Sequence, residues 1–158
     1  MPIRRLRAYL DGHNIGYTVI NHSSDLSAWE VAQSTHISGR EIAKTVILTM
    51  DQQTAMVVLP ASCRINSEFF KAFNDTQNVR LATEDEMRRF FPDCEIGAMP
   101  PFGNLYSIGV YVAEQLTEDD EIIFNAGNHR QLIQMRYSDF DRLVRPVVLN
   151  YILTASKY

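Results

Sequence analysis

One lysine in an apolar segment is the residue of this sequence best suited to do chemistry. Residues 42–50 are rich in isoleucine, valine, leucine and threonine, which is typical of a strand. Alternation along a strand places Lys44 on the same face as Val46 and Leu48. An ammonium group is rarely left without a partner on an apolar face. Such a cation is suited to binding a phosphate or to stabilising negative charge that develops at a carbonyl.

Two other interpretations of Lys44 remain open at this stage. An inward-pointing lysine can protect the edge of a sheet against pairing with another chain. Alternatively, its aliphatic stem lies along apolar side chains while the ammonium group reaches the surface.

Two loops are further candidates for a binding site. The segment 97–103 holds two prolines between two glycines, so a rigid loop there can direct backbone N–H groups at a ligand. The segment 125–129 reads Asn-Ala-Gly-Asn-His directly after an apolar strand, and His129 is suited to shaping a pocket. Each loop also has a simpler interpretation, as a stiff connection and as a hairpin turn.

The remaining pattern predicts the elements that must position these residues. Helices are predicted over 3–10, from a capping box at Ser27–Glu30, over 67–73, from a second capping box at Thr83–Glu86, and over 138–143. Strands are predicted over 17–20, 42–50, 54–59, 79–82, 107–113, 121–125 and 132–136, with a turn at Gln52-Gln53. We expect an α+β fold with a mixed, mostly antiparallel sheet and short surrounding helices. The apolar tail over 147–158 fits either a strand or a helix.

Composition narrows the class of protein. The 158 residues are 46% hydrophobic and 22% charged, which is typical of one globular domain over 1–158. No apolar run approaches the ~20 residues that span a bilayer, and no signal peptide is recognised. A net charge of −4 argues against a protein that coats DNA or RNA, although not against contact with one RNA end. Cys63 and Cys94 lie in no metal motif, so we expect free thiols, no metal and a cytoplasmic location.

Taken in order, these segments resemble the YbaK/ProX family of aminoacyl-tRNA editing domains, which is related to the insertion domain of bacterial prolyl-tRNA synthetases. The resemblance covers about residues 3–146 and rests on His22 after a strand, the Ala-Lys-Thr strand at 43–45, Gly97 and Pro101 of a Gly-x-x-x-Pro loop, and Asn-Ala-Gly-Asn-His at 125–129. It implies a trans-acting deacylase that hydrolyses the ester of a mischarged tRNA and needs no cofactor. Alanine or cysteine on the proline tRNA is the implied substrate.

The resemblance also implies roles for particular residues. Lys44 would hold the terminal nucleotide and favour charge on the ester carbonyl, and backbone groups from Gly97 onward would hold the aminoacyl group. The implied catalytic residues are therefore Lys44 and Gly97. The implied substrate-binding residues are His22, Thr45, Ala98, Met99, Pro100, Pro101, Asn125, Gly127 and His129. No nucleophile–base pair is visible, so a hydroxyl of the terminal ribose is expected to activate the attacking water.

Two other functions are compatible with the same residues, and the surface that would contact RNA remains open. The chain could be a non-catalytic module that binds tRNA ends, amino acids or a synthetase, or a hydrolase of a small acylated metabolite. For RNA contact the candidates are Arg40, Arg64 and the cluster Arg4, Arg5 and Arg7, although a solvated helix face explains that cluster as well.

Overall fold

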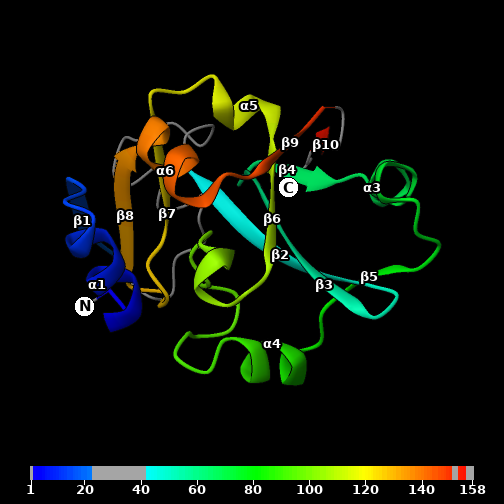
Figure 1. Cartoon of the computed structure of the whole chain (residues 1–158), viewed down its shortest axis with the longest axis horizontal. Coiled ribbons are helices and arrows are strands. Elements are labelled where there is room, and N and C mark those ends of the chain that lie inside the picture. Colours follow the sequence, from blue (N-terminus) through cyan, green and yellow to red (C-terminus); the bar gives the residue numbers. More distant parts are fainter. Residues whose placement is uncertain (1, 23–41, 151–152, 156–158) are drawn as a thin grey trace.

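The computed structural model describes residues 2–22, 42–150 and 153–155 (Figure 1). The strands are β1 (Tyr17–Asn21), β2 (Ala43–Met50), β3 (Gln53–Pro60), β4 (Cys63–Ile65), β5 (Val79–Leu81), β6 (Gly109–Ala113), β7 (Glu121–Asn125), β8 (Gln131–Arg136), β9 (Val147–Leu149) and β10 (Leu153–Ala155). The helices are α1 (Arg4–Gly12), α3 (Ser67–Asn74), α4 (Glu84–Phe90), α5 (Glu114–Thr117) and α6 (Tyr137–Val144), with a 3₁₀ turn η1 (Gly103–Leu105). The helix predicted from Ser27 lies outside the described residues.

The described strands form three sheets. Five strands pair in the order β5-β2-β3-β6-β9, three in the order β1-β8-β7, and β10 pairs with β4. The β3–β6 and β6–β9 pairs are parallel and the other pairs are antiparallel. A parallel bridge between Ile42 and Ile123 joins the start of β2 to β7. The predicted α+β class, with mixed pairing and short helices, is confirmed.

Alternation along the central strands creates two apolar clusters, one on each face of the five-stranded sheet. Ala43 and Ile47 of β2 belong to the larger cluster, which also contains side chains of α1, β7, β8 and α6. Leu48 and Met50 belong to the smaller cluster, which includes Phe70 of α3. Side chains of β3 belong alternately to the two clusters, so this strand is buried on both faces. Burying both faces at about 25 cal/mol per Å² of apolar area stabilises this sheet as the centre of the fold.

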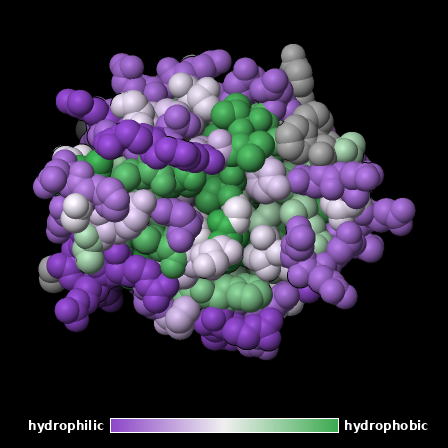
Figure 2. Space-filling view, viewed as in Figure 1, coloured by the Kyte–Doolittle hydropathy of each residue, from purple (hydrophilic) through white to green (hydrophobic). Residues whose placement is uncertain are grey.

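Figure 1 shows how the other elements surround this sheet. The three-stranded sheet and α1 lie on one side, α3 lies beside the opposite edge, and α4 lies below the sheet in this view. The face drawn in Figure 2 is polar around its rim and has an apolar area over β9. Val147 and Val148 of β9 are exposed there, as the edge position of this strand allows. No helix in the described ranges is long and apolar enough to cross a membrane.

Several local predictions differ from the structure by a few residues. The turn after β2 is Asp51-Gln52, not Gln52-Gln53, because Asp51 takes a left-handed conformation (φ 51°) that aspartate tolerates well. The strand predicted from Ser107 begins at Gly109, since Ser107 has a φ of 59°. The tail, left open between strand and helix, forms β9 and β10. Strand β4 and helix α5 were not predicted, because three- and four-residue elements carry almost no periodicity.

The capping box that was predicted at the start of α4 is confirmed. The Thr83 hydroxyl accepts from the backbone N–H of Glu86, and the Glu86 carboxylate accepts from the backbone N–H of Thr83. The helix ends at Phe90, two residues before Pro92. This helix therefore begins and ends where its sequence specifies, and it leads directly into the loop that carries Gly97.

The segment before α1 is tied to the turn between β7 and β8. The backbone N–H of Ile3 donates to the carbonyl of Ala126 at 3.0 Å. Gly127 has a φ of 92°, and a Cβ atom on it would overlap the Ile3 side chain. Glycine is therefore required at this position by both its backbone conformation and its neighbour.

Gly127→Ala is expected to destabilise the protein by at least the ~1–3 kcal/mol associated with a strained backbone conformation. The measurement is the free energy of unfolding from denaturant titration. Gly109→Ala is the matched control, because a Cβ on Gly109 meets nothing within 4 Å. Equal stability of the two variants would contradict this account of Gly127.

Candidate active site

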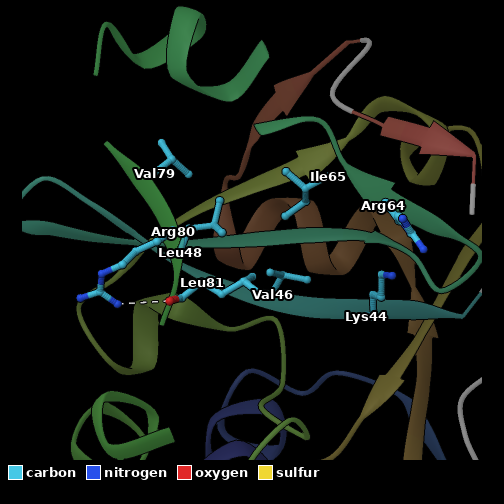
Figure 3. A pocket seen from close by; sticks show the side chains of 8 residues that line it. All are labelled: Lys44, Val46, Leu48, Arg64, Ile65, Val79, Arg80 and Leu81. Atoms are coloured by element: carbon cyan, nitrogen blue, oxygen red, sulfur yellow. Dashed lines mark hydrogen bonds between the residues drawn. The ribbon is translucent and has the colours of Figure 1, made fainter. Parts of the chain in front are cut away.

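Lys44 lies where the alternation predicted, on the face of β2 that also carries Val46 and Leu48 (Figure 3). It lies near the start of β2, pairs with Leu59 of β3 and is half-buried. Within the described ranges no carboxylate lies within ion-pairing distance of its ammonium group. Burial lowers the pKa of Lys44; the nearby Cys63 thiol opposes this shift, and the charge of Arg64 adds to it. Keeping this ammonium group charged in the folded protein therefore lowers the stability of the fold.

A pocket of about 470 Å³ opens beside Lys44. Its described lining residues are Lys44, Val46, Leu48, Arg64, Ile65, Val79, Arg80 and Leu81. They include three cations and no acid, with apolar side chains between them. Figure 3 shows Lys44 and Arg64 together at one end and Arg80 at the other.

The charge of Arg80 is already compensated. Its guanidinium donates to both carboxylate oxygens of Glu86, at 2.7 and 3.1 Å, and to the carbonyl of Leu81 at 3.2 Å. The hydrogen bonds from Arg80 and Thr83 lower the pKa of Glu86 to about 2, so the pair is ionised on both sides at neutral pH. Lys44 and Arg64 supply the cations at the other end of the pocket.

The loop around Gly97 is fastened to the turn around Gly127. The backbone N–H of Glu95 donates to the Gly127 carbonyl at 2.8 Å, and the Gly127 N–H donates to the Ala98 carbonyl at 3.0 Å. One carboxylate oxygen of Glu95 accepts from the backbone N–H of His129 at 3.2 Å. Gly97 has a φ of 83°, and its open side faces the His129 ring. The structure thus brings Gly97, Gly127 and His129 together.

The imidazole of His129 has a defined tautomer. Its Nε2 lies 2.7 Å from the carbonyl of Ile96, and a carbonyl can only accept. Nε2 therefore carries the proton, and in the neutral ring Nδ1 is left as an acceptor. An acceptor of this kind is suited to receive a hydrogen bond from an ammonium or hydroxyl group of a ligand.

The side chains that follow Gly97 do not face solvent. Ala98, Met99, Pro100 and Pro101 are buried, and Ala98 and Met99 pack among residues of the core. At these positions the backbone, and not the side chain, is what the described structure can offer to a ligand. Gly97 itself is exposed.

The other predicted site residues occupy separate places. Thr45 lies on the opposite face of β2 from Lys44 and is half-buried. The backbone N–H of His22 donates to the carbonyl of Arg130 just beyond β1. Asn125 is the last residue of β7 and pairs with Leu132 of β8. Because the bridge between Ile42 and Ile123 is parallel, Asn125 and Lys44 each lie two residues further along neighbouring strands.

The described candidates therefore form two groups at the junction of two sheets. The first group is Lys44 with its pocket, and the second is the paired loops with Gly97 and His129. The lining residues given for the pocket include no member of the second group. Glu95, Arg80 and Leu81 were missed by sequence reasoning, because exposed Glu, Arg and Leu carry no spacing signal.

The basic cluster at the N-terminal helix is partly used within the fold. The Arg5 guanidinium lies 3.5 Å from the Asp93 carboxylate and 4.7 Å from the centre of the Tyr106 ring. The Arg7 side chain donates to the carbonyl of Pro2 at 3.0 Å. These contacts favour a structural role for both residues. Arg40 lies outside the described residues, and Arg64 lies in the pocket beside Lys44.

Comparison with known proteins identifies the family. The aminoacyl-tRNA editing domain matches residues 22–143, and the chain belongs to this family. A proline–tRNA ligase of Macrococcus caseolyticus is 29% identical over a region covering 63% of this chain and 19% of the ligase. The chain thus spans about a fifth of the length of that relative.

Solved structures share the fold. A protein proposed as a trans-editing enzyme for prolyl tRNA synthetase superimposes with a TM-score of 0.82 at 21% identity, over 93% of this chain and 94% of that one. A protein described only as hypothetical superimposes with a TM-score of 0.83 at 18% identity, over 96% of this chain and all of its own. The YbaK-like fold implied by the sequence resemblance is therefore confirmed.

Lys44→Met is expected to leave the thermal unfolding midpoint unchanged or to raise it at neutral pH. A lysine whose pKa falls on folding binds its proton more weakly in the native state, so its charge costs stability below the native pKa. That cost lessens as pH rises through the native pKa. Thermal unfolding at neutral pH followed by circular dichroism is the measurement, and a clearly lower midpoint would indicate that Lys44 has a structural role.

Proposed function

We propose that this chain is a trans-acting deacylase that hydrolyses the ester bond of a mischarged aminoacyl-tRNA. The observation that carries the proposal is Lys44, an unpaired cation among the described residues, held on an apolar face beside a pocket in a member of the aminoacyl-tRNA editing domain family. The similarity in fold to a protein proposed as a trans-editing enzyme for prolyl tRNA synthetase supports action in trans. We expect it to act in the cytoplasm, where aminoacyl-tRNA is made.

The proposed reaction is an attack of water on the ester carbonyl of the aminoacyl group. As the tetrahedral intermediate forms, negative charge develops on the carbonyl oxygen, and the Lys44 ammonium stabilises it. The bond from the carbonyl carbon to the ribose oxygen then breaks. The water proton passes to that oxygen through the neighbouring ribose hydroxyl, which gives a free amino acid and an uncharged tRNA.

The paired loops are proposed to hold the aminoacyl group. Exposed Gly97 lets the backbone approach a ligand closely, and Nδ1 of His129 is available to accept from its ammonium group. A small substrate such as alanine or cysteine, on the proline tRNA, is the proposed target. Hydrolytic editing is needed for such pairs because a synthetase pocket distinguishes one methylene by only about 10–200-fold.

Lys44→Ala is expected to reduce single-turnover deacylation of alanyl-tRNA(Pro) by about 10²–10³-fold, as for removal of a group that stabilises an oxyanion. Lys71→Ala is the matched control, because it removes the same charge from a lysine that pairs with Glu68 on α3. Unchanged hydrolysis by Lys44→Ala would remove Lys44 from the mechanism.

The same assay separates the proposal from its rivals. The panel comprises alanyl-, cysteinyl-, seryl- and prolyl-tRNA(Pro), together with the alanyl ester of adenosine. Binding without ester loss across the panel would indicate a non-catalytic module that binds tRNA ends. Equal turnover of the nucleoside ester and the tRNA would indicate a hydrolase of small acylated compounds.

Glu95→Ala is expected to lower kcat/KM for the preferred substrate by about fivefold to tenfold. It removes the acceptor of the His129 backbone N–H, and one such hydrogen bond contributes about 1 kcal/mol. Glu95→Gln keeps an acceptor oxygen and is expected to retain most of the activity. Glu118→Ala, an exposed position beside α5, serves as the control. Equal activity of the alanine and glutamine variants would show that this bond does not position the site.

A further inference from the structure

The volume of the pocket beside Lys44 is larger than one amino acid needs. One end of the pocket is cationic, and most of the other lining side chains are apolar. Its cationic end holds Lys44 and Arg64. Val46, Leu48 and Ile65 lie between this end and the short edge strand β5, which contributes Val79 and Leu81 (Figure 3). A volume of about 470 Å³ falls in the range of small-molecule sites.

Leu81 is the unusual member of this lining. It is 66% exposed, which makes it the most exposed large hydrophobic residue in the described part of the chain. It ends β5, which pairs with β2 alone among the described strands. Exposing a leucine beside an apolar pocket leaves it available to contact a ligand.

Hydrogen bonds join this edge to α4 and to β2. The Arg80 guanidinium joins the carbonyl of Leu81 to the Glu86 carboxylate of α4, and the backbone N–H of Ala82 donates to the carbonyl of Ile47 at 2.9 Å. Arg80 is thereby turned away from the cationic end, as Figure 3 shows. A fixed apolar surface loses little conformational entropy when a ligand is placed on it.

We propose that Leu81 and Val79 form a shelf for the base of the substrate's 3′-terminal adenosine, while the Lys44–Arg64 end neutralises its phosphate. This inference rests on the proposed function. An acidic peptide or a long nucleic-acid backbone requires cations that can bind along the whole groove, whereas Arg80 at the far end is paired with Glu86. One phosphate followed by one flat, weakly polar ring matches that order of charge and apolar surface.

The proposal is tested with the full chain and two probes, adenosine 5′-monophosphate and ribose 5-phosphate, whose dissociation constants are measured by NMR titration. Wild type is expected to bind the nucleotide at least fivefold more tightly, since contact with a base contributes about 1–3 kcal/mol. Leu81→Ser is expected to remove most of this difference, and Leu81→Trp to enlarge it. Val148→Ser is the matched control, because Val148 is exposed on β9, at the opposite edge of the same sheet.

Three results would contradict the proposal that Leu81 and Val79 form a shelf for the base. They are equal affinity of wild type for the two probes, no binding of either at millimolar concentration, and self-association that Leu81→Ser abolishes without changing nucleotide affinity. Folding of each variant is checked by its thermal unfolding midpoint.

Deacylation kinetics separate this proposal from the proposed function. Leu81→Ser is expected to raise KM for aminoacyl-tRNA about fivefold or more with little change in kcat. If Lys44→Ala abolishes hydrolysis while Leu81→Ser changes neither KM nor nucleotide binding, only the shelf fails. If wild type binds the nucleotide as described but hydrolyses no ester, only the deacylase function fails.

Discussion

The proposed site depends on an ammonium group that is held on the apolar face of β2, an interior strand of the five-stranded sheet. Lys44 follows the alternation of β2, so its side chain lies on the same face as Val46 and Leu48. The charge is desolvated there, and within the described residues no acid compensates it. Selection for stability alone would favour leucine or methionine at this position. A lysine at this position is explained if a negatively charged ligand pairs with its ammonium group.

The rest of the fold fixes where that cation lies relative to the loops. Strand β2 belongs to the five-stranded sheet, and the loop with His129 follows β7 of the three-stranded sheet. The two sheets meet at the bridge between Ile42 and Ile123, where a small apolar cluster with Leu132 packs. Because interiors are densely packed, that cluster sets the separation of the two groups of the proposed site with little freedom.

Much of this could be predicted from the sequence, for physical reasons that differ between elements. The orientation of Lys44 followed from period-two alternation, and the start of α4 from the reciprocal bonds of Thr83 and Glu86, which are both local properties. The contact of Glu95 with His129 spans 34 residues and has no local signature. The shelf residue Leu81 belongs to a three-residue strand, which is too short for a pattern. Burial of Met99 also depends on packing partners distant in sequence.

The contact of Ile3 with the turn at Ala126 and Gly127 makes the N-terminal segment part of the support for both loops. Three distant segments, at 3, 95–98 and 126–129, must meet before either loop has its final shape. Closing such long loops costs entropy that only the finished contacts offset. A change in any one of these three segments therefore affects the shape of the proposed binding loops, although the segments lie far apart in the sequence.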